Sequence, residues 1–299
     1  MTALKERRWE IMEVGETFGP VMVDVDNALL RGFAYSVDDF SPGHLLPGPD
    51  GVHRAHPVLL CREARDVIAT HYDIASGGAG MHVKHECFFH GCPVVGSTYV
   101  ITGRHTEKFI KRDKQYIVLE ADVSDRDGRL LMRQRSTHIR ALKPGVAKSV
   151  APADAAPPPR EGPVAAHADE AVEGALLKPL EKRLTQEHLT VFAGTSWNNI
   201  HNDPAIARQA GLAGTIASGL QTLAAVSELM GVYFGAGWTD HGHIAVAFTA
   251  PLLVDQPFAA GARILSRTDT RVTAEVWAET PAGLCVLAGQ ASAAHSIRS

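Results

Sequence analysis

The sequence is poor in cysteine, poor in aromatic residues and free of long hydrophobic runs. Four cysteines occur in 299 residues, none in a Cys-x-x-Cys spacing, which argues against a disulfide framework or a zinc knuckle. The longest nearly apolar stretch, residues 244–254, is too short to span a bilayer. The charged residues 5–8 are followed by no apolar signal segment. We therefore expect a cytoplasmic protein without a membrane partner.

A strong excess of charge of either sign is also missing. The formal net charge is -4, and no segment is dense in lysine and arginine, so nucleic acid is not expected as a partner. Hydrophobic residues make up 45% of the chain, which is enough to bury one large core or two ordinary ones.

Histidine, by contrast, is abundant, with fifteen residues. The strongest candidate metal ligands are His82, His85, Cys87 and His90, and a second pair is formed by His241 and His243. Successive side chains of a strand point to opposite faces, so a strand over residues 82–89 would separate His82 from His85. We therefore predict no metal site there.

The most informative feature is an internal repeat. Residues 35–44 and 192–201 place aromatic residues at matching positions, in the same register, and the two segments end at His44 and His201. Similar segments followed by similar downstream patterns indicate a duplicated unit and not two unrelated modules.

The two copies differ at one chemically important position. Asp39 stands five residues before His44, whereas Ser196 stands five residues before His201. A carboxylate can hold an imidazole or accept a proton near neutral pH, and a hydroxyl group cannot replace it in either role.

A segment rich in alanine and proline separates the repeats, with three prolines at 157–159. Its composition predicts a linker over residues 144–183, between an N-terminal domain at 1–143 and a C-terminal domain at 184–299. Asp26 and Thr185 are candidate N-caps of a short helix in each half.

Each half then shows a central helix followed by strands. In the second half, residues 216–234 are apolar on most sides. In the first, the pattern begins at Pro57 and predicts a helix with one wet face, which carries Arg62, Glu63, Arg65 and Asp66. Alternating patterns predict strands at 81–89, 98–106, 115–123, 130–139, 244–250, 262–267, 271–279 and 284–291. The order of a central helix followed by an antiparallel sheet occurs twice. This indicates an α+β fold in which the two halves pair along a sheet edge.

The second repeat resembles the signature of the MaoC-like enoyl-CoA hydratases and dehydratases, an R-specific hydratase-like family of the hot-dog fold. Phe192, Asn198, Ile200, His201, Asp203 and Ala207 fall on that signature, and a glycine-rich helix opening follows at 211–219. The first half resembles the partner hot dog of two-domain members through residues 80–82 and 93–96. The resemblance implies a double hot-dog, with a long central helix wrapped by a curved antiparallel sheet in each repeat.

The resemblance also implies a reaction. In this family an aspartate and a histidine act together on one water, which is added to an enoyl thioester or removed from a 3-hydroxyacyl thioester. Backbone amides of the helix opening, at Gly214, Thr215, Ile216, Ser218 and Gly219, would bind the substrate and its thioester oxygen. An acyl-CoA or carrier-bound acyl thioester would be the substrate, without a redox or metal cofactor. A homodimer of double hot-dogs is a further expectation.

The sequence departs from the family where the chemistry is performed. Ser196 occupies the aspartate position and Asn199 the proline position, while Asn198 and His201 are kept. The first half keeps the charged pair, Asp39 and His44, but Pro57 removes a backbone donor from its helix opening.

Three interpretations remain open. In the first, His201 is the acid and base, Asn198 orients it and Ser196 holds a water or a substrate hydroxyl. In the second, Asp39 and His44 perform the chemistry. In the third, both sites are weakened and the protein binds an acyl thioester or a related small molecule without turnover. A hydro-lyase is the favoured prediction.

A hot-dog acyl-CoA thioesterase is an alternative from another class. Ser196 and His201 would then be a nucleophile and its base, or Glu63 would supply the carboxylate. No third orienting residue is evident in the sequence.

Overall fold

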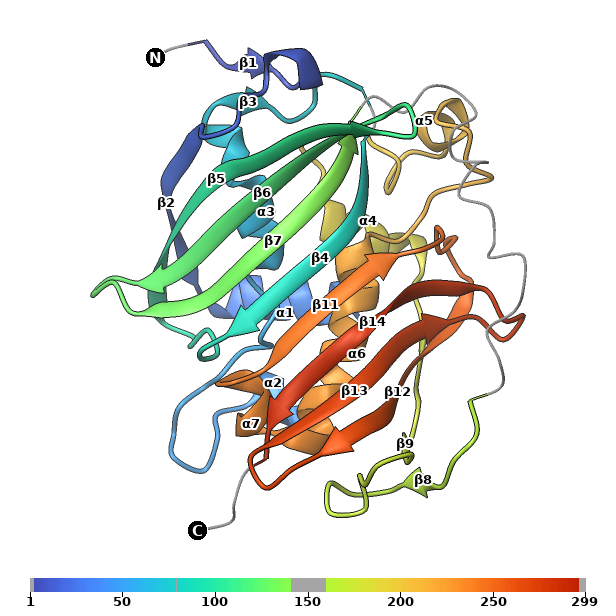
Figure 1. Cartoon of the computed structure of the whole chain (residues 1–299). Coiled ribbons are helices and arrows are strands. Elements are labelled where there is room, and N and C mark those ends of the chain that lie inside the picture. Colours follow the sequence, from blue (N-terminus) through green and yellow to red (C-terminus); the bar gives the residue numbers. More distant parts are fainter. Residues whose placement is uncertain (1–2, 79, 141–159, 296–299) are drawn as a thin grey trace.

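A computed structural model describes residues 3–78, 80–140 and 160–295 (Figure 1). Residues 144–159 of the predicted linker lie outside the described residues. The two halves are α+β units that share one sheet of twelve described strands, and helices lie behind it (Figure 1). The arrangement is a double hot-dog.

The first half begins with β2 and the capped helix α1. The side chain of Asp26 accepts a hydrogen bond from Leu29 N–H at 2.8 Å, as expected of an N-cap. The elements of this half are β1 (Lys5–Glu6), η1 (Trp9–Ile11), β2 (Thr17–Val25), α1 (Asn27–Ser36), α2 (Pro42–Leu45), α3 (Cys61–Asp66), η2 (Val67–Thr70), β3 (Tyr72–Asp73), β4 (Met81–Phe89), β5 (Ser97–Lys111), β6 (Lys114–Asp125) and β7 (Leu130–Arg140).

The second half repeats this order. Thr185 caps α4 in a capping box completed by His188, which confirms the second predicted N-cap. Its elements are β8 (Val164–Ala165), β9 (Leu176–Leu177), β10 (Leu180–Arg183), α4 (Gln186–Ala193), α5 (Pro204–Gln209), α6 (Gly219–Phe234), α7 (Ala236–Thr239), β11 (His243–Phe248), β12 (Pro257–Arg267), β13 (Arg271–Glu279) and β14 (Cys285–Ala294).

The strand order shows the duplication directly. The first half runs β2-β5-β6-β7-β4 and the second runs β10-β12-β13-β14-β11. Antiparallel pairing of β4 with β11 joins the two sheets edge to edge. His243 on β11 reinforces this seam, because its Nε2 lies 2.9 Å from an oxygen of Glu86 and its ring stacks on Phe88 at 4.3 Å. Pairing removes one bare edge from each half.

The two central helices differ in length. α6 packs against β12, β13 and β14 and is buried along most of its length, whereas α3 ends after six residues and continues as the short helix η2. The prediction of a long central helix in the first half is therefore wrong. Four of the six residues of α3 are charged, so only its Cys61 and Ala64 side can pack into the core.

The last part of the predicted linker is structured. Residues 164–183 contain β8, β9 and β10, and β10 pairs with β12 from Leu180↔Ala260 to Arg183↔Pro257. Buried apolar side chains such as Leu177 and Ala175 attach this segment to the second half. A composition rich in alanine and small polar residues does not reveal such short strands.

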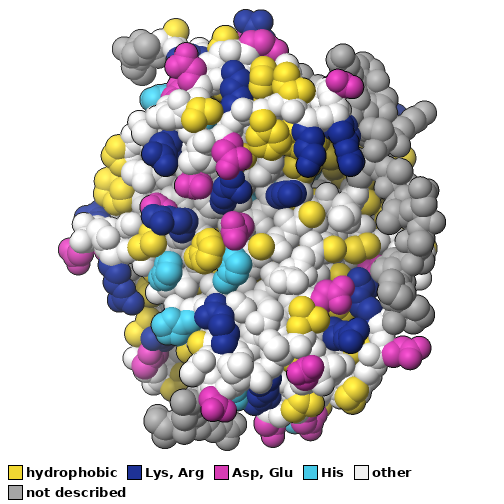
Figure 2. All heavy atoms as spheres, in the orientation of Figure 1, with side chains coloured by type: hydrophobic (Ala, Val, Ile, Leu, Met, Phe, Trp, Pro, Cys, Tyr) yellow, Lys and Arg dark blue, Asp and Glu magenta, His cyan; other side chains and the backbone are white. Residues whose placement is uncertain are grey.

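The outer face of the sheet carries basic and acidic side chains interspersed with apolar ones (Figure 2). Arg133 and Asp122 on neighbouring strands form a bidentate pair there, with N–O distances of 2.7 Å. None of the helices in the described part of the chain is long and apolar enough to cross a membrane.

Candidate active site

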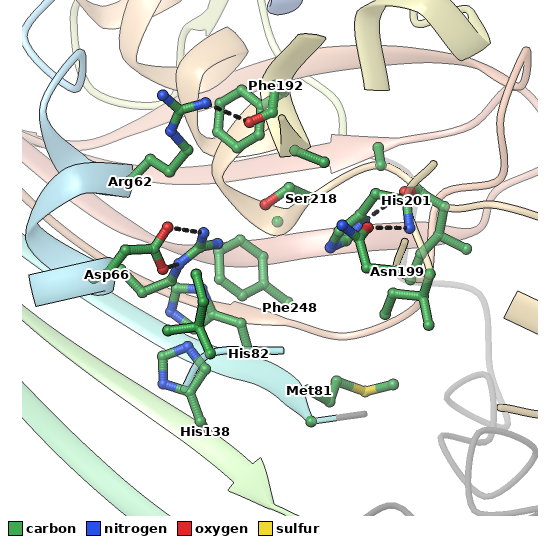
Figure 3. A pocket seen from close by; sticks show the side chains of 18 of the residues that line it. Arg62, Asp66, Met81, His82, His138, Phe192, Asn199, His201, Ser218 and Phe248 are labelled. Atoms are coloured by element: carbon green, nitrogen blue, oxygen red, sulfur yellow. Dashed lines mark hydrogen bonds and ion pairs between the residues drawn. The ribbon is translucent and has the colours of Figure 1, made fainter. Parts of the chain in front are cut away.

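A cavity of about 450 Å³ lies between the two halves and is lined by residues of both (Figure 3). The second half contributes His201, Ser196 and the start of α6, and the first half contributes α3 and residues of β4 and β7. α3, which lines this cavity, has six residues, against 16 in α6. The cavity is large enough for a small acyl group.

His201 is held on the cavity wall in one orientation. Its Nδ1 lies 2.8 Å from the carbonyl oxygen of Ile216. A carbonyl only accepts hydrogen bonds, so Nδ1 carries the proton and Nε2 keeps a lone pair. Burial lowers the pKa of His201 to about 4, despite the opposing effect of the bond to Ile216. The imidazole is therefore neutral at pH 7 and able to accept a proton.

The backbone on both sides of this imidazole is also fixed. Asn199 Oδ1 accepts the His201 N–H at 2.9 Å, and Gln186 Nε2 donates to the His201 carbonyl at 2.9 Å. The prediction that Asn198 orients the imidazole is wrong, because its side chain is exposed and donates to Asp203 at 3.0 Å. Sequence reasoning missed Asn199, which stands where the family has proline and is buried on the cavity wall.

Ser196 lines the same cavity. Its hydroxyl makes none of the hydrogen bonds found among the described residues. No hydrogen bond or ion pair joins His201 to a carboxylate within the described ranges. A backbone carbonyl therefore takes the place that a carboxylate occupies in the first copy.

Of the five residues predicted at the opening of α6, Ile216, Ser218 and Gly219 lie on the cavity wall. Gly214 and Thr215 lie off the wall, and the Ile216 N–H is bonded to Ile200 O at 3.3 Å. Ser218 and Gly219 do line the wall. Ser218 is the N-cap of α6, and the N–H of Gly219 has no partner among the described residues.

Gly219 also allows close packing against β11. A Cβ at this position would lie 2.7 Å from ring atoms of Phe248, which lines the cavity as well. Only glycine lets the helix start approach the ring this closely without a clash.

The charged residues of α3 line the cavity and do not form a purely solvated surface, which corrects that prediction. Arg62 binds Glu63 through Nη2 at 2.7 Å and also donates to the carbonyl of Phe192 on α4. Arg65 binds Asp66 through two contacts of 2.8 Å. Oε2 of Glu63 is buried without a hydrogen-bond partner among the described residues.

The predicted pair of the first half is present and tightly bonded. His44 Nδ1 lies 2.5 Å from Asp39 Oδ2, and Ser41 N–H donates to the other carboxylate oxygen at 3.0 Å. Burial on its own would raise the pKa of Asp39, but the bonds from His44 and Ser41 and the nearby His56 hold that pKa well below its usual range. Asp39 is therefore an anion.

The surroundings of this pair are filled by buried polar side chains. The ring of His56 lies 4.7 Å from that of His44, and Lys182 donates to the carbonyl of Asp38. Lys182 also pairs with Glu228 of α6 at 2.7 Å. Asp39 and His44 are not among the residues that line the cavity beside His201.

The candidate metal ligands meet in an unexpected way. A bulge in β4 between His82 and Lys84 shifts the alternation of side chains, so His82 and His85 share a face. His85 Nδ1 lies 3.3 Å from His82 Nε2. The prediction that they point apart is wrong. Cys61, His85 and Cys87 bring three ligand atoms within 4.8 Å of one another, while His90 and His241 are exposed. Burial and the neighbouring Cys61 raise the pKa of Cys87 well above its usual value, so without a bound ion it is a thiol at neutral pH.

Comparison with solved structures identifies the fold. A MaoC-like dehydratase superposes with a TM-score of 0.76 at 18% identity, covering 96% of this chain and 100% of the other. A MaoC-like dehydratase from Phytophthora capsici gives 0.70 at 14% identity, covering 95% and 97%. A conserved hypothetical protein from Mycobacterium tuberculosis, described as a double hotdog fold, gives 0.62 at 17% identity, covering 97% and 98%. The chain is a double hot-dog protein.

The second half is more specifically assigned. Residues 168–280 match the family model described as MaoC like domain, so this part of the chain is a MaoC-like domain. The match includes Ser196, His201 and the whole of α6. No curated protein sequence matches the chain.

Proposed function

We propose that the protein is a hydro-lyase that hydrates an enoyl thioester, or dehydrates the corresponding 3-hydroxyacyl thioester, in the cavity beside His201. The observation that carries this proposal is the fixed imidazole. Its Nδ1 is bonded to Ile216 O, and Nε2 remains as a proton acceptor on the wall of an acyl-sized cavity. The MaoC-like domain and its fold support the same reaction class.

One histidine is enough to balance the proton transfers. Nε2 of His201 takes a proton from water as the water oxygen bonds to C3 of the enoyl group. The imidazolium then returns that proton to C2, so water is added and the histidine is regenerated. Dehydration follows the same path in reverse.

The thioester oxygen gains negative charge during this step. The free N–H of Gly219 at the start of α6 is the proposed donor to that oxygen, because it lies on the cavity wall at the positive end of a helix of 16 residues. Ser196 is proposed to hold the water. Asp39 and His44, enclosed by Lys182 and Glu228, are proposed to stabilise the contact between the halves.

Replacing His201 tests the proposal. Full-length His201→Gln should lose at least about 100-fold in kcat/KM for a panel of trans-2-enoyl-CoA substrates, followed by the loss of enoyl-thioester absorbance. Its thermal midpoint should match that of the unchanged protein. His90→Gln, at an exposed position, is the matched control. Retained activity in His201→Gln, or abolished activity in a folded Asp39→Asn variant, would show that the chemistry lies elsewhere.

A thioesterase is the second candidate, favoured by Glu63. Its Oε2 is buried at the cavity without a described partner and is a free carboxylate oxygen that can activate water. The same samples distinguish the two reactions, since a thioesterase releases free CoA thiol and a hydratase does not. Loss of thiol release in Glu63→Gln would assign that second reaction.

A further inference from the structure

One wall of the cavity carries two arginines without carboxylate partners. Arg7 lies between β1 and η1, and Arg140 ends β7. Arg140 is only 5% exposed, and its Nη2 donates to the carbonyl of Arg7 at 3.3 Å. The Nε atoms of both residues are buried without a partner, and no carboxylate within the described ranges pairs with either guanidinium.

The other two arginines of the cavity are neutralised. Arg62 pairs with Glu63 and Arg65 with Asp66. The nearby imidazoles add no charge, since burial lowers the pKa values of His82 and His138 well below the usual value. Arg7 and Arg140 therefore leave the cavity with an excess of positive charge.

An unpaired guanidinium is costly to keep away from water. Burial and the proximity of Arg7 lower the pKa of Arg140 to about 9, so it is still charged at pH 7. Asp66 and Asp73 act on Arg7 only without direct pairing. Two cations that face one cavity without a paired carboxylate are expected where a ligand supplies the negative charge.

The surroundings of the two arginines indicate the shape of that ligand. Met12, His105, Ile117 and Leu119 line the same part of the cavity and are each at most 4% exposed. These buried and mostly apolar lining residues suit a carboxylate at the tip of a short chain better than a hydrated diphosphate. A planar carboxylate also matches the two-pronged donor geometry of arginine.

We propose that Arg7 and Arg140 form a subsite for a carboxylate at the far end of the acyl chain. The inference rests on the proposed hydro-lyase function and specifies its substrate class: thioesters of dicarboxylic acids, in which one carboxyl group forms the thioester and the other stays free.

Paired substrates test this subsite. The first set is a series of ω-carboxy-2-enoyl-CoA thioesters, and the second has the same lengths but ends in an isopropyl group, which has the shape of a carboxylate without its charge. The unchanged protein should favour the carboxylated member of its best pair by about 10- to 100-fold in kcat/KM. Arg140→Gln and Arg7→Gln should each reduce that ratio by about 10-fold or more. Arg129→Gln, at an exposed turn position, should leave the ratio unchanged.

The phosphates of CoA are the other source of negative charge. If they occupied the subsite, Arg140→Gln would weaken both substrate sets equally, and the effect would vanish with N-acetylcysteamine thioesters. Either result would overturn the carboxylate assignment, as would an unchanged ratio in both arginine variants.

Binding without turnover separates this inference from the proposed function. Free glutarate and adipate, titrated by calorimetry into the full chain, should bind at least about 10-fold more weakly to Arg140→Gln. If the protein binds these diacids but hydrates no thioester, the result would support the carboxylate subsite and contradict the proposed hydro-lyase function. Absence of diacid binding in a protein that hydrates uncharged enoyl thioesters would reject the subsite alone.

Discussion

At the scale of single residues, the two copies of the repeat hold the same ring nitrogen with different acceptors. Nδ1 of His44 is bonded to the carboxylate of Asp39, and Nδ1 of His201 is bonded to the carbonyl of Ile216. A carboxylate stabilises an imidazolium far more than a neutral carbonyl does. Burial can therefore keep the pKa of His201 at about 4.

Introducing the missing carboxylate should change both the rate and its pH dependence. In Ser196→Asp, an anion near His201 stabilises the protonated ring and raises its pKa. The acidic limb of the kcat/KM profile, expected near pH 4 in the unchanged protein, should move up by about one pH unit or more. Crotonyl-CoA hydration at pH 8 should rise by about 10-fold. An unshifted limb with no gain in rate would mean that residue 196 does not reach the imidazole; Ser196→Asn controls for shape.

Several residues of the motif could be placed at the cavity from the sequence, whereas Asn198 of the same motif is bonded to Asp203 instead. His201, Ser196, Ser218 and Gly219 lie on one cavity wall, as the repeat and the helix opening indicated. The partner of the imidazole could not be predicted, because a backbone carbonyl such as that of Ile216 leaves no trace in residue identity. For the same reason the sequence does not show which amide of residues 214–219 is left as the free donor.

At the scale of helices and strands, Gln221 joins three helices. It lies in the first turn of α6 and is 1% exposed. Its Oε1 accepts the Ser218 N–H at 2.9 Å, and its Nε2 donates to Ser36 O of α1 at 2.7 Å and to His188 O of α4 at 3.4 Å. One amide thus completes the N-cap of α6 and ties it to both repeat helices.

Removing this amide should destabilise the fold. Gln221→Leu keeps the approximate size of the side chain but leaves buried donors and acceptors unpaired, which should lower the free energy of unfolding by about 2–4 kcal/mol. The urea midpoint followed by circular dichroism measures the loss. Gln209→Leu, at an exposed position on α5, should change it by less than about 0.5 kcal/mol. Equal midpoints for the two variants would contradict the joining role of Gln221.

The periodicity of the sequence predicted whether a segment is a helix or a strand more reliably than it predicted where the segment begins and ends. The strand predictions at 81–89 and 271–279 match β4 and β13, and α6 begins three residues after its predicted start. The alternation rule failed inside β4, because a bulge depends on pairing with β7 and not on the local sequence. The length of α3 likewise depends on what packs around it.

At the scale of the whole molecule, the fold buries several histidines in the uncharged form. His56, His85 and His105 are each 1% exposed. Burial lowers the pKa of the first two to about 3 and of the third to about 4. In the unfolded chain the same groups titrate near 6.5. Below that pH the unfolded state therefore binds protons that the folded state does not bind.

Stability should therefore fall as the pH drops from 7.5 to 5.5. Each of His56, His85 and His105 removes about 1.4 kcal/mol at pH 5.5, or about 4 kcal/mol together. Glu228 offsets less than half of this loss of stability. Burial and Asp39 raise its pKa to about 7, so its ionised form destabilises the folded state, and protonation below that pH removes this effect. Urea unfolding at several pH values measures the slope. His85→Phe should reduce proton uptake on unfolding by about one, whereas His167→Gln, at an exposed position, should not. Stability that is constant down to pH 5.5 would mean that these histidines are protonated in the folded protein.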